Sequence, residues 1–186
     1  MQENCHQMVS AEEVIRINRC LAEHGIQTWL MGGWGIDALL GEQTRPHKDL
    51  DVVMLLDDVI RTNAILEGLG YTFAYLWPEN RPAIDRQGIE TATAYVLQDT
   101  DGREIDIHAF VFDEQGNGIP AWADAVDFIF KIEDLAGKGV IAGFAVQCLT
   151  PEMQVRCHLG YEVPEKQRHD LARLQATYGV ELPDGQ

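Results

Sequence analysis

The chain has 186 residues, of which 46% are hydrophobic and 24% charged, a balance typical of one compact globular domain and not of a disordered or membrane-embedded chain. Thirty acidic residues against fourteen basic ones give a formal charge of −16, which disfavours nucleic acid and favours cationic partners. No apolar run approaches the roughly 20 residues that cross a bilayer, and the N-terminal residues carry no secretion pattern, so we expect a cytoplasmic protein without membrane association.

Helices and strands alternate in the first 70 residues. Ser10 is a capping residue, and apolar residues follow it at helical spacing, while Gly41 and Gly70 are typical of helix C-terminal ends. The expected elements are a helix over Ser10–His24, a strand over Ile26–Met31, a helix over Trp34–Leu40, a strand over Leu50–Leu56 and a helix over Asp57–Leu69.

The middle of the chain is strand-rich, and its end is helical. Turn signals at Gln87-Gly88 and Asp101-Gly102 favour antiparallel hairpins. The expected strands are Ala83–Arg86, Glu90–Gln98, Arg103–Phe112, Phe128–Ile132 and Gly143–Leu149, and the expected helices are Glu152–Leu159 and Glu165–Tyr178. The pattern predicts an α/β (α+β) fold with a mixed β-sheet flanked by helices, in which residues 1–150 form the main domain and 151–186 a small C-terminal helical segment.

The glycine-rich stretch from Gly33 to Ala38 satisfies the GxGxxA form of a dinucleotide-binding fingerprint. In that fold, however, the acid that binds the ribose ends the second strand, whereas Asp49 and Asp51 precede most of the apolar residues of theirs. The later hairpins also replace the repeated βαβ units of a dinucleotide fold. An oxidoreductase is therefore disfavoured, and a P-loop is excluded because no GxxxxGK[ST] occurs.

A magnesium site explains more of these residues together. Asp49 and Asp51 are two positions apart in a strand, so their carboxylates project from one face and can bind the same hard cation. Asp106 would supply a third carboxylate from a later strand, where Glu104 and His108 share its face. Carboxylates beside strands are usually only solvated, so each residue taken alone has an ordinary alternative; the combination favours a metal site.

Nucleotidyl transfer needs such an arrangement, because two magnesium ions can neutralise a triphosphate and hold the leaving pyrophosphate. Gly32, Gly33 and Gly35 would let backbone N–H groups approach the phosphates at a helix N-terminus. Arg45 and Lys48 could add positive charge nearby, or could be surface residues that pair with the acidic skin.

The string Gly32-Gly33-Trp34-Gly35-Ile36-Asp37, followed by Thr44-Arg45-Pro46-His47-Lys48-Asp49-Leu50-Asp51, resembles the polymerase-β-like nucleotidyltransferase superfamily. Within it the chain resembles the small antibiotic enzymes, namely the aminoglycoside 2″-nucleotidyltransferases and the lincosamide nucleotidyltransferases. Ile105–His108 and the tail residues 157–162 and 169–171 look closer to the lincosamide members. The stretches 75–88 and 120–122 match neither subgroup closely, and their Trp77 and Trp122 are as consistent with a pocket as with the core.

The resemblance implies a nucleotidyltransferase fold whose catalytic domain covers residues 1–150. It implies that Asp49 and Asp51 bind Mg²⁺, that Asp106 binds metal or acts as the general base, that Gly32 and Gly33 face the triphosphate, and that Arg45, His47 and Lys48 lie near the nucleotide. Glu104 stays open as the alternative to Asp106 for the base. The implied reaction transfers AMP from ATP, or another nucleoside monophosphate, to a hydroxyl of a lincosamide such as lincomycin or clindamycin. An aminoglycoside acceptor, a macromolecular acceptor of the toxin–antitoxin type, and a catalytically inactive nucleotide-binding domain are the alternatives, and the resemblance allows a homodimer.

Overall fold

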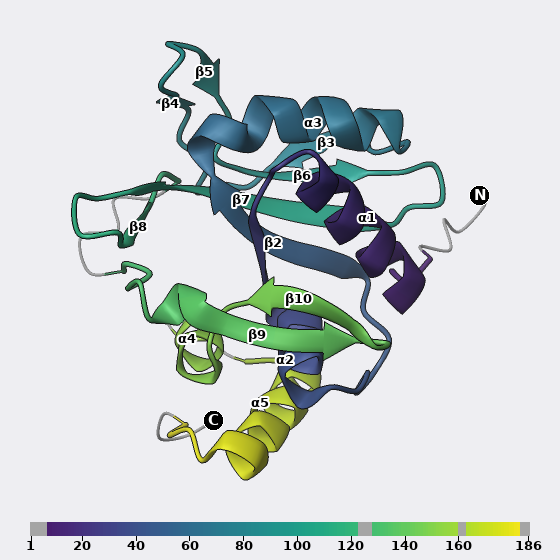
Figure 1. The fold of residues 1–186 in the computed structure, drawn as a ribbon. Helices are drawn as coiled ribbons and strands as arrows, with labels where there is room; N and C mark the ends of the chain where they lie inside the picture. The colour runs from purple at the N-terminus through teal and green to yellow at the C-terminus, as the bar shows by residue number, and fades with distance from the viewer. Residues whose placement is uncertain (1–6, 123–127, 160–162, 183–186) are drawn as a thin grey trace.

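The computed structural model describes residues 7–122, 128–159 and 163–182, and a mixed eight-stranded sheet dominates it (Figure 1). Its strands are β1 Thr28–Met31, β2 Asp49–Leu55, β3 Thr72–Leu76, β6 Ala94–Gln98, β7 Glu104–Phe112, β8 Gly118–Pro120, β9 Gly137–Ile141 and β10 Phe144–Cys148. They run in the order β3-β6-β7-β2-β1-β10-β9, and β8 pairs with β7. Two pairs are parallel, β2 with β7 and β1 with β10, so the mixed sheet predicted from the sequence is confirmed.

Helices flank the sheet in two groups (Figure 1). They are α1 Ala11–Glu23, α2 Gly32–Leu40, α3 Val59–Gly68, α4 Pro151–Arg156 and α5 Glu165–Tyr178. The first group, α1 and α3, covers one face of the sheet, whereas α2, α4 and α5 gather beside β9 and β10. No helix in the described ranges is long and apolar enough to cross a membrane.

Alternation along β2 separates the core from the opposite face of the sheet. Leu50, Val52 and Met54 are at most 3% exposed and pack in the main core with α1 and α3. Asp49 and Asp51 occupy the intervening positions and are partly exposed. Because successive strand residues point to opposite faces, burial of the apolar set places both aspartates on the face away from α1 and α3.

The two C-terminal helices pack against α2 through a separate apolar cluster. Its buried members are Ile36, Val155, Val163, Leu171, Leu174 and Val180. The predicted helix over Glu165–Tyr178 is confirmed, while the one expected over Glu152–Leu159 begins at Pro151 and ends at Arg156. The division of the chain at residue 150 stays a prediction.

The elements predicted before residue 70 are present, with shifted ends. The helix expected from Trp34 begins two residues earlier, at Gly32, and the strand expected from Leu50 begins at Asp49. The helix expected from Asp57 is preceded by a 3-10 turn over Leu56–Asp58 and becomes α-helical at Val59. The sequence pattern predicts these ends only to within two residues, because each boundary depends on local hydrogen bonds that the pattern does not contain.

The structure differs from the prediction at two of the expected strands. Phe128–Ile132 is no strand, because only Phe130 forms an isolated bridge, to Gly118. Glu90–Gln98 is broken at Ala92-Thr93: its first part, β5 (Glu90–Thr91), pairs with β4 (Ala83–Ile84) in a ribbon of its own, and only Ala94–Gln98 joins the main sheet. The break falls where the backbone N–H of Thr93 donates to the Asn80 side chain, 2.8 Å away, instead of to a strand.

Three strands of the main sheet were missed. The five residues of β3 are all exposed, so this strand has no alternation of buried and exposed side chains, and β8 has only three residues. The sequence of β9, GKGVI, contains two glycines that weaken any strand signal. A Cβ atom at Gly139 would lie 2.4 Å from the carbonyl carbon and oxygen of Ala38, so glycine is needed where β9 crosses α2.

We expect Gly139→Ala to destabilise the protein by about 1–3 kcal/mol, because the new methyl group meets helix backbone that cannot move aside. Gly68→Ala is the matched control, since it adds the same group in open space at the end of α3. Thermal unfolding of both variants measures the difference. Equal melting temperatures would contradict the close packing of α2 on β9.

Candidate active site

The predicted carboxylates meet on two neighbouring parallel strands. In the pairing of β2 with β7, Asp49 lies opposite Glu104 and Asp51 lies opposite Asp106. All four positions share one parity along their strands, so the side chains project from the same face of the sheet. The structure therefore brings together Asp49, Asp51 and Asp106, as the sequence predicts, with Glu104 beside them.

Two of these carboxylates have strong hydrogen-bond donors of their own. Lys48 Nζ lies 2.7 Å from Glu104 Oε2, and Gln98 Nε2 donates to Glu104 Oε1 at 3.0 Å. The contact with Glu104 also raises the pKa of Lys48, chiefly through the hydrogen bond between the two side chains. Asp106 Oδ1 accepts a hydrogen bond from the indole Nε1 of Trp77 at 2.8 Å. Glu104 is thus neutralised by a cation, whereas Asp106 is held by a neutral donor.

The surroundings of Asp51 disfavour its ionised form. Burial raises the pKa of Asp51 well above its usual range, and repulsion from Asp49 and Asp106 raises it further, while Arg45 opposes the shift. Like charges this close disfavour ionisation unless a cation joins them. Mg²⁺ prefers oxygen ligands, so the donor set and its unmet charge fit this ion.

As the side chains lie in the described residues, no three of the Asp, Glu, His or Cys groups are arranged so that they could hold a metal ion. The fit to Mg²⁺ therefore rests on donor chemistry and on the raised pKa of Asp51, and the metal role of the three aspartates stays a prediction.

Gly32 is required next to Asp51. Its φ of +59° lies in the left-handed region, and a Cβ atom there would lie 2.2 Å from Asp51 Oδ2. Gly32 is the first residue of α2, which has no side-chain cap. The backbone of the α2 N-terminus is thereby brought against the carboxylate of Asp51. Gly32 and Gly33 belong to the first turn of this helix and not to a loop before it.

The segment between α2 and β2 is fixed by a buried polar network. Asp37 Oδ2 lies 2.5 Å from His47 Nε2, and both side chains are 2% exposed. Asp37 Oδ1 accepts from Thr44 N at 3.1 Å and from Thr44 Oγ1 at 2.6 Å. A Cβ atom at Gly33 would lie 2.1 Å from His47 Nδ1. His47 is therefore enclosed by α2, where it supports the segment that leads into Asp49.

Arg45 links the same segment to the C-terminal helix. Its Nη2 lies 2.7 Å from Asp170 Oδ2, and its Nε donates to the same oxygen at 2.9 Å. Asp170 is buried in α5. Arg45 is also near enough to Asp51 to lower its pKa, so this cation lies between α5 and the acidic site and is not an ordinary surface residue.

Several residues around the site received no role from the sequence. Asp37 and Asp170 lie within the strings that carry the family resemblance, but no contact could be assigned to them there, and Trp77 was left open between pocket and core. Trp122 instead packs against the apolar cluster that contains Phe130; its ring centroid lies 4.9 Å from that of His108 and 6.0 Å from that of Phe130. Only the three-dimensional pairing of distant segments identifies such partners.

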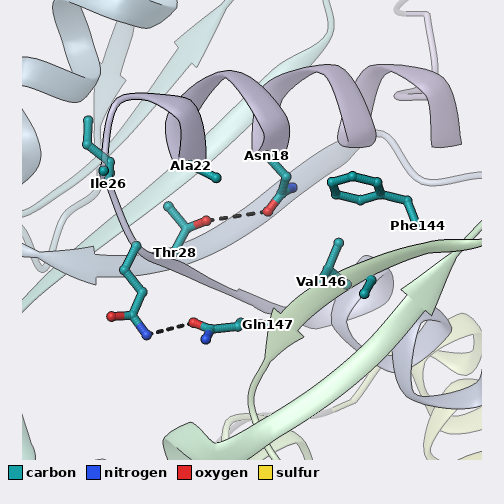
Figure 2. Close-up of a pocket in the computed structure, with 10 residues that line it drawn as sticks. Asn18, Ala22, Ile26, Thr28, Phe144, Val146 and Gln147 are labelled. Carbon is teal, nitrogen blue, oxygen red and sulfur yellow. Dashed lines mark hydrogen bonds between the residues drawn. The ribbon is translucent and has the colours of Figure 1, made fainter.

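The cavity in Figure 2, of about 340 Å³, lies elsewhere, between α1, β1 and β10. It is lined by Asn18, Ala22, Gly25, Ile26, Gln27, Thr28, Phe144, Ala145, Val146 and Gln147. Its polar side chains bind one another: Gln27 Nε2 donates to Gln147 Oε1 at 2.7 Å, and the hydroxyl of Thr28 donates to Asn18 Oδ1 at 3.4 Å. None of the lining residues is charged, so this cavity is unsuited to a triphosphate.

The chain has the fold of two nucleotidyltransferases of known structure. A lincosamide antibiotic adenylyltransferase, LnuA, solved with lincomycin, has the same fold with a TM-score of 0.75 at 23% identity, over 91% of this chain and 99% of that one. ANT(2")-Ia, solved with adenylyl-2"-tobramycin, gives a TM-score of 0.67 at 20% identity, over 90% and 88% of the two chains.

The chain belongs to the aminoglycoside-2''-adenylyltransferase family, whose model matches residues 13–174. A lincosamide resistance protein of Staphylococcus haemolyticus is 23% identical over 168 residues, which is 90% of this chain and 96% of that protein. A 2''-aminoglycoside nucleotidyltransferase of Escherichia coli is 39% identical over 61 residues, 31% of this chain and 34% of its own. The family predicted from the sequence is confirmed, and with it an enzyme of the antibiotic nucleotidyltransferase class.

The raised pKa of Asp51 predicts a pH-dependent cost in stability. From about pH 4 upward, the unfolded chain loses this proton before the folded chain does, so the free energy of unfolding falls as pH rises toward the raised pKa. Asp51→Asn removes the charge. We expect it to raise the melting temperature of the metal-free protein at pH 8 by about 2 °C or more, and the gain to shrink as the pH falls toward 4.

The control is Asp101→Asn, which removes an exposed carboxylate paired with Arg103 and should leave the melting temperature nearly unchanged. Both variants are unfolded thermally in EDTA between pH 4 and 8. An Asp51→Asn protein no more stable than wild type at pH 8 would show that the carboxylates do not repel one another in the fold.

Proposed function

We propose that the protein inactivates a small cationic antibiotic by transferring a nucleoside monophosphate, AMP from ATP, to one of its hydroxyl groups, and so gives resistance. The observation that carries the proposal is the register of β2 with β7, which places Asp49, Asp51 and Asp106 on one face of the sheet. Three carboxylates without a matching cation are what a metal-bound triphosphate needs. Family membership supports the reaction class.

Asp49 and Asp51 would hold two Mg²⁺ ions, and Asp106 would either complete this metal site or take up the proton of the acceptor hydroxyl. When bound, Mg²⁺ supplies the positive charge that offsets the triphosphate and favours ionisation of the acceptor hydroxyl. The acceptor oxygen forms a bond to the α-phosphorus, the bond to the pyrophosphate oxygen breaks, and the hydroxyl proton leaves for a base. The chain has to bind both substrates in line and to take up that proton.

Asp106 is a better candidate for the base than Glu104. Both oxygens of Glu104 are engaged, one by Lys48 and the other by Gln98, so neither is free to contact the acceptor hydroxyl. Asp106 is engaged through Oδ1 only, by an uncharged indole. A hydrogen bond from a neutral donor fixes the carboxylate without cancelling its charge.

The nucleotide side of the site would be formed by the start of α2 and by Arg45. The N–H groups of Gly32 and Gly33 lie in the first helical turn, where the backbone favours phosphate. Arg45, held by Asp170, supplies a fixed positive charge, and Lys48 supplies a second while it is paired with Glu104.

A lincosamide such as lincomycin or clindamycin is our first choice of acceptor. The supporting observation is the lincosamide resistance protein that is similar over 90% of this chain, whereas the aminoglycoside enzyme of higher identity matches only 31% of it. Both acceptors are cationic and suit a charge of −16. An aminoglycoside is the second candidate, supported by the family that the chain belongs to.

Other acceptors fit less well. Strong acidity disfavours an RNA acceptor of the toxin–antitoxin type, and three retained carboxylates argue against a domain that only binds nucleotide. We further propose that the protein acts in the cytoplasm without nucleic acid or membrane, and that it can form a homodimer.

The substrate can be identified by mass spectrometry after lincomycin, clindamycin and an aminoglycoside panel are incubated with the protein, Mg²⁺ and each nucleoside triphosphate. We expect a lincosamide product heavier by one AMP with ATP, absent with Asp51→Asn. A product formed only from an aminoglycoside would make that drug the acceptor. If no drug is modified, yet Mg-ATP raises the melting temperature, the antibiotic part of the proposal is wrong.

The choice of base can be tested with Asp106→Asn and Glu104→Gln. We expect Asp106→Asn to lower kcat by about 10²–10⁴-fold, as removal of a general base does. Glu104→Gln is the matched control, because it also replaces a carboxylate by its amide on β7, and we expect it to retain most of kcat. A greater loss of kcat in Glu104→Gln would assign the base to Glu104.

A further inference from the structure

Trp77 contacts Asp106, the carboxylate proposed as the base. It follows the end of β3, and its indole Nε1 donates to Asp106 Oδ1 at 2.8 Å. The indole N–H is a donor only, so this group cannot compete with Asp106 for a proton. Asp106 is 7% exposed, so little water reaches it and the hydrogen bond is worth more than it would be at the surface.

The indole is held in place by the backbone around it. Trp77 N donates to Ala94 O at 3.1 Å, and Trp77 O accepts from Asn80 N at 3.0 Å. Asn80 Oδ1 in turn accepts from Thr93 N at 2.8 Å and from Ala94 N at 3.1 Å. The segment is thereby fastened to the start of β6, the strand next to β7, and Tyr75 packs edge-on against the Trp77 ring at 5.6 Å.

The two oxygens of Asp106 are in different surroundings. Oδ1 accepts the hydrogen bond of the indole N–H, and His108 Nδ1 lies 3.3 Å from the same oxygen without forming a hydrogen bond. Among the described residues, no hydrogen bond or ion pair involves Oδ2. Rotation of the carboxylate would break its hydrogen bond to the indole. Trp77 therefore fixes the orientation in which the second oxygen, Oδ2, is left for other partners.

We propose that Trp77 is a positioning residue: its indole N–H fixes Oδ1 of Asp106, so that Oδ2 is the oxygen presented to the acceptor hydroxyl. This role rests on the proposed function of Asp106. Loss of orientation at a reacting group lowers the rate of the chemical step more than it lowers binding. The effect should therefore fall on kcat.

Trp77→Phe keeps an aromatic ring and removes the donor. We expect kcat to fall about 10- to 100-fold, with the KM for Mg-ATP within about twofold of wild type, and Trp77→His, whose ring can again donate an N–H, to recover part of kcat. Trp122→Phe is the matched control, because it removes another partly exposed indole that lies against His108 and not against Asp106. We expect it to retain most of kcat.

The hydrogen bond itself can be tested without turnover. The chain has four tryptophans, and in ¹⁵N-labelled protein the indole signal absent from Trp77→Phe belongs to Trp77. We expect Asp106→Ala to shift this signal strongly and the other three little. An unshifted Trp77 signal would overturn the proposal.

The kinetic outcomes separate this inference from the proposed function. An active wild type with a full kcat in Trp77→Phe would overturn the positioning role and leave the proposed function intact. A Trp77→Phe enzyme whose loss lies wholly in the KM for the acceptor would also overturn it, because Trp77 would then be a binding residue. A wild type that modifies no acceptor would contradict the proposed function itself, whatever the indole signal shows.

Discussion

The parallel pairing of β2 with β7 is the constraint on which the rest of the site depends. It sets Asp51 beside Asp106, an arrangement that is electrostatically unfavourable, as the raised pKa of Asp51 shows. The pairing is held by the opposite face of the same strands, where Leu50, Val52 and Ile107 are at most 3% exposed. A slip of one residue would expose that apolar set and bury the acids. The hydrophobic core therefore enforces a cluster of charge that the carboxylates alone would avoid.

The segment between α2 and β2 is fixed at both ends, which extends the site beyond the sheet. Asp37 binds Thr44 and His47 inside the fold, and Asp170 on α5 binds Arg45. A buried carboxylate that loses its cation is strongly destabilising, so α5 and Arg45 depend on one another. Because Arg45 also acts on the pKa of Asp51, the C-terminal helix influences the acidic cluster without supplying a carboxylate to it.

The sequence predicts the parts of the site that follow from alternation and motif. The spacing of Asp49 and Asp51 and the alternation around Asp106 sufficed to place three acids on one face, although the pairing of their strands is a long-range fact that no local pattern contains. The partners of these residues could not be predicted in the same way. Lys48 was expected near the nucleotide and is paired with Glu104, and His47 is enclosed by α2. Short exposed strands such as β3 were missed because they lack a buried face.

In the proposed reaction, the negative charge of the chain attracts a cationic acceptor but cannot distinguish one such drug from another, since the field acts on net charge. Shape and fixed polar groups must therefore choose the acceptor. Trp77 lies outside the motifs that carry the family resemblance, and yet it binds Asp106 directly. Asn80 and Thr93 hold that stretch against β6 with several hydrogen bonds. This segment is held too firmly to adjust, so a change in its sequence would disturb the orientation of Asp106, the proposed base. The rate of the proposed reaction therefore depends on a segment that supplies no carboxylate to the site.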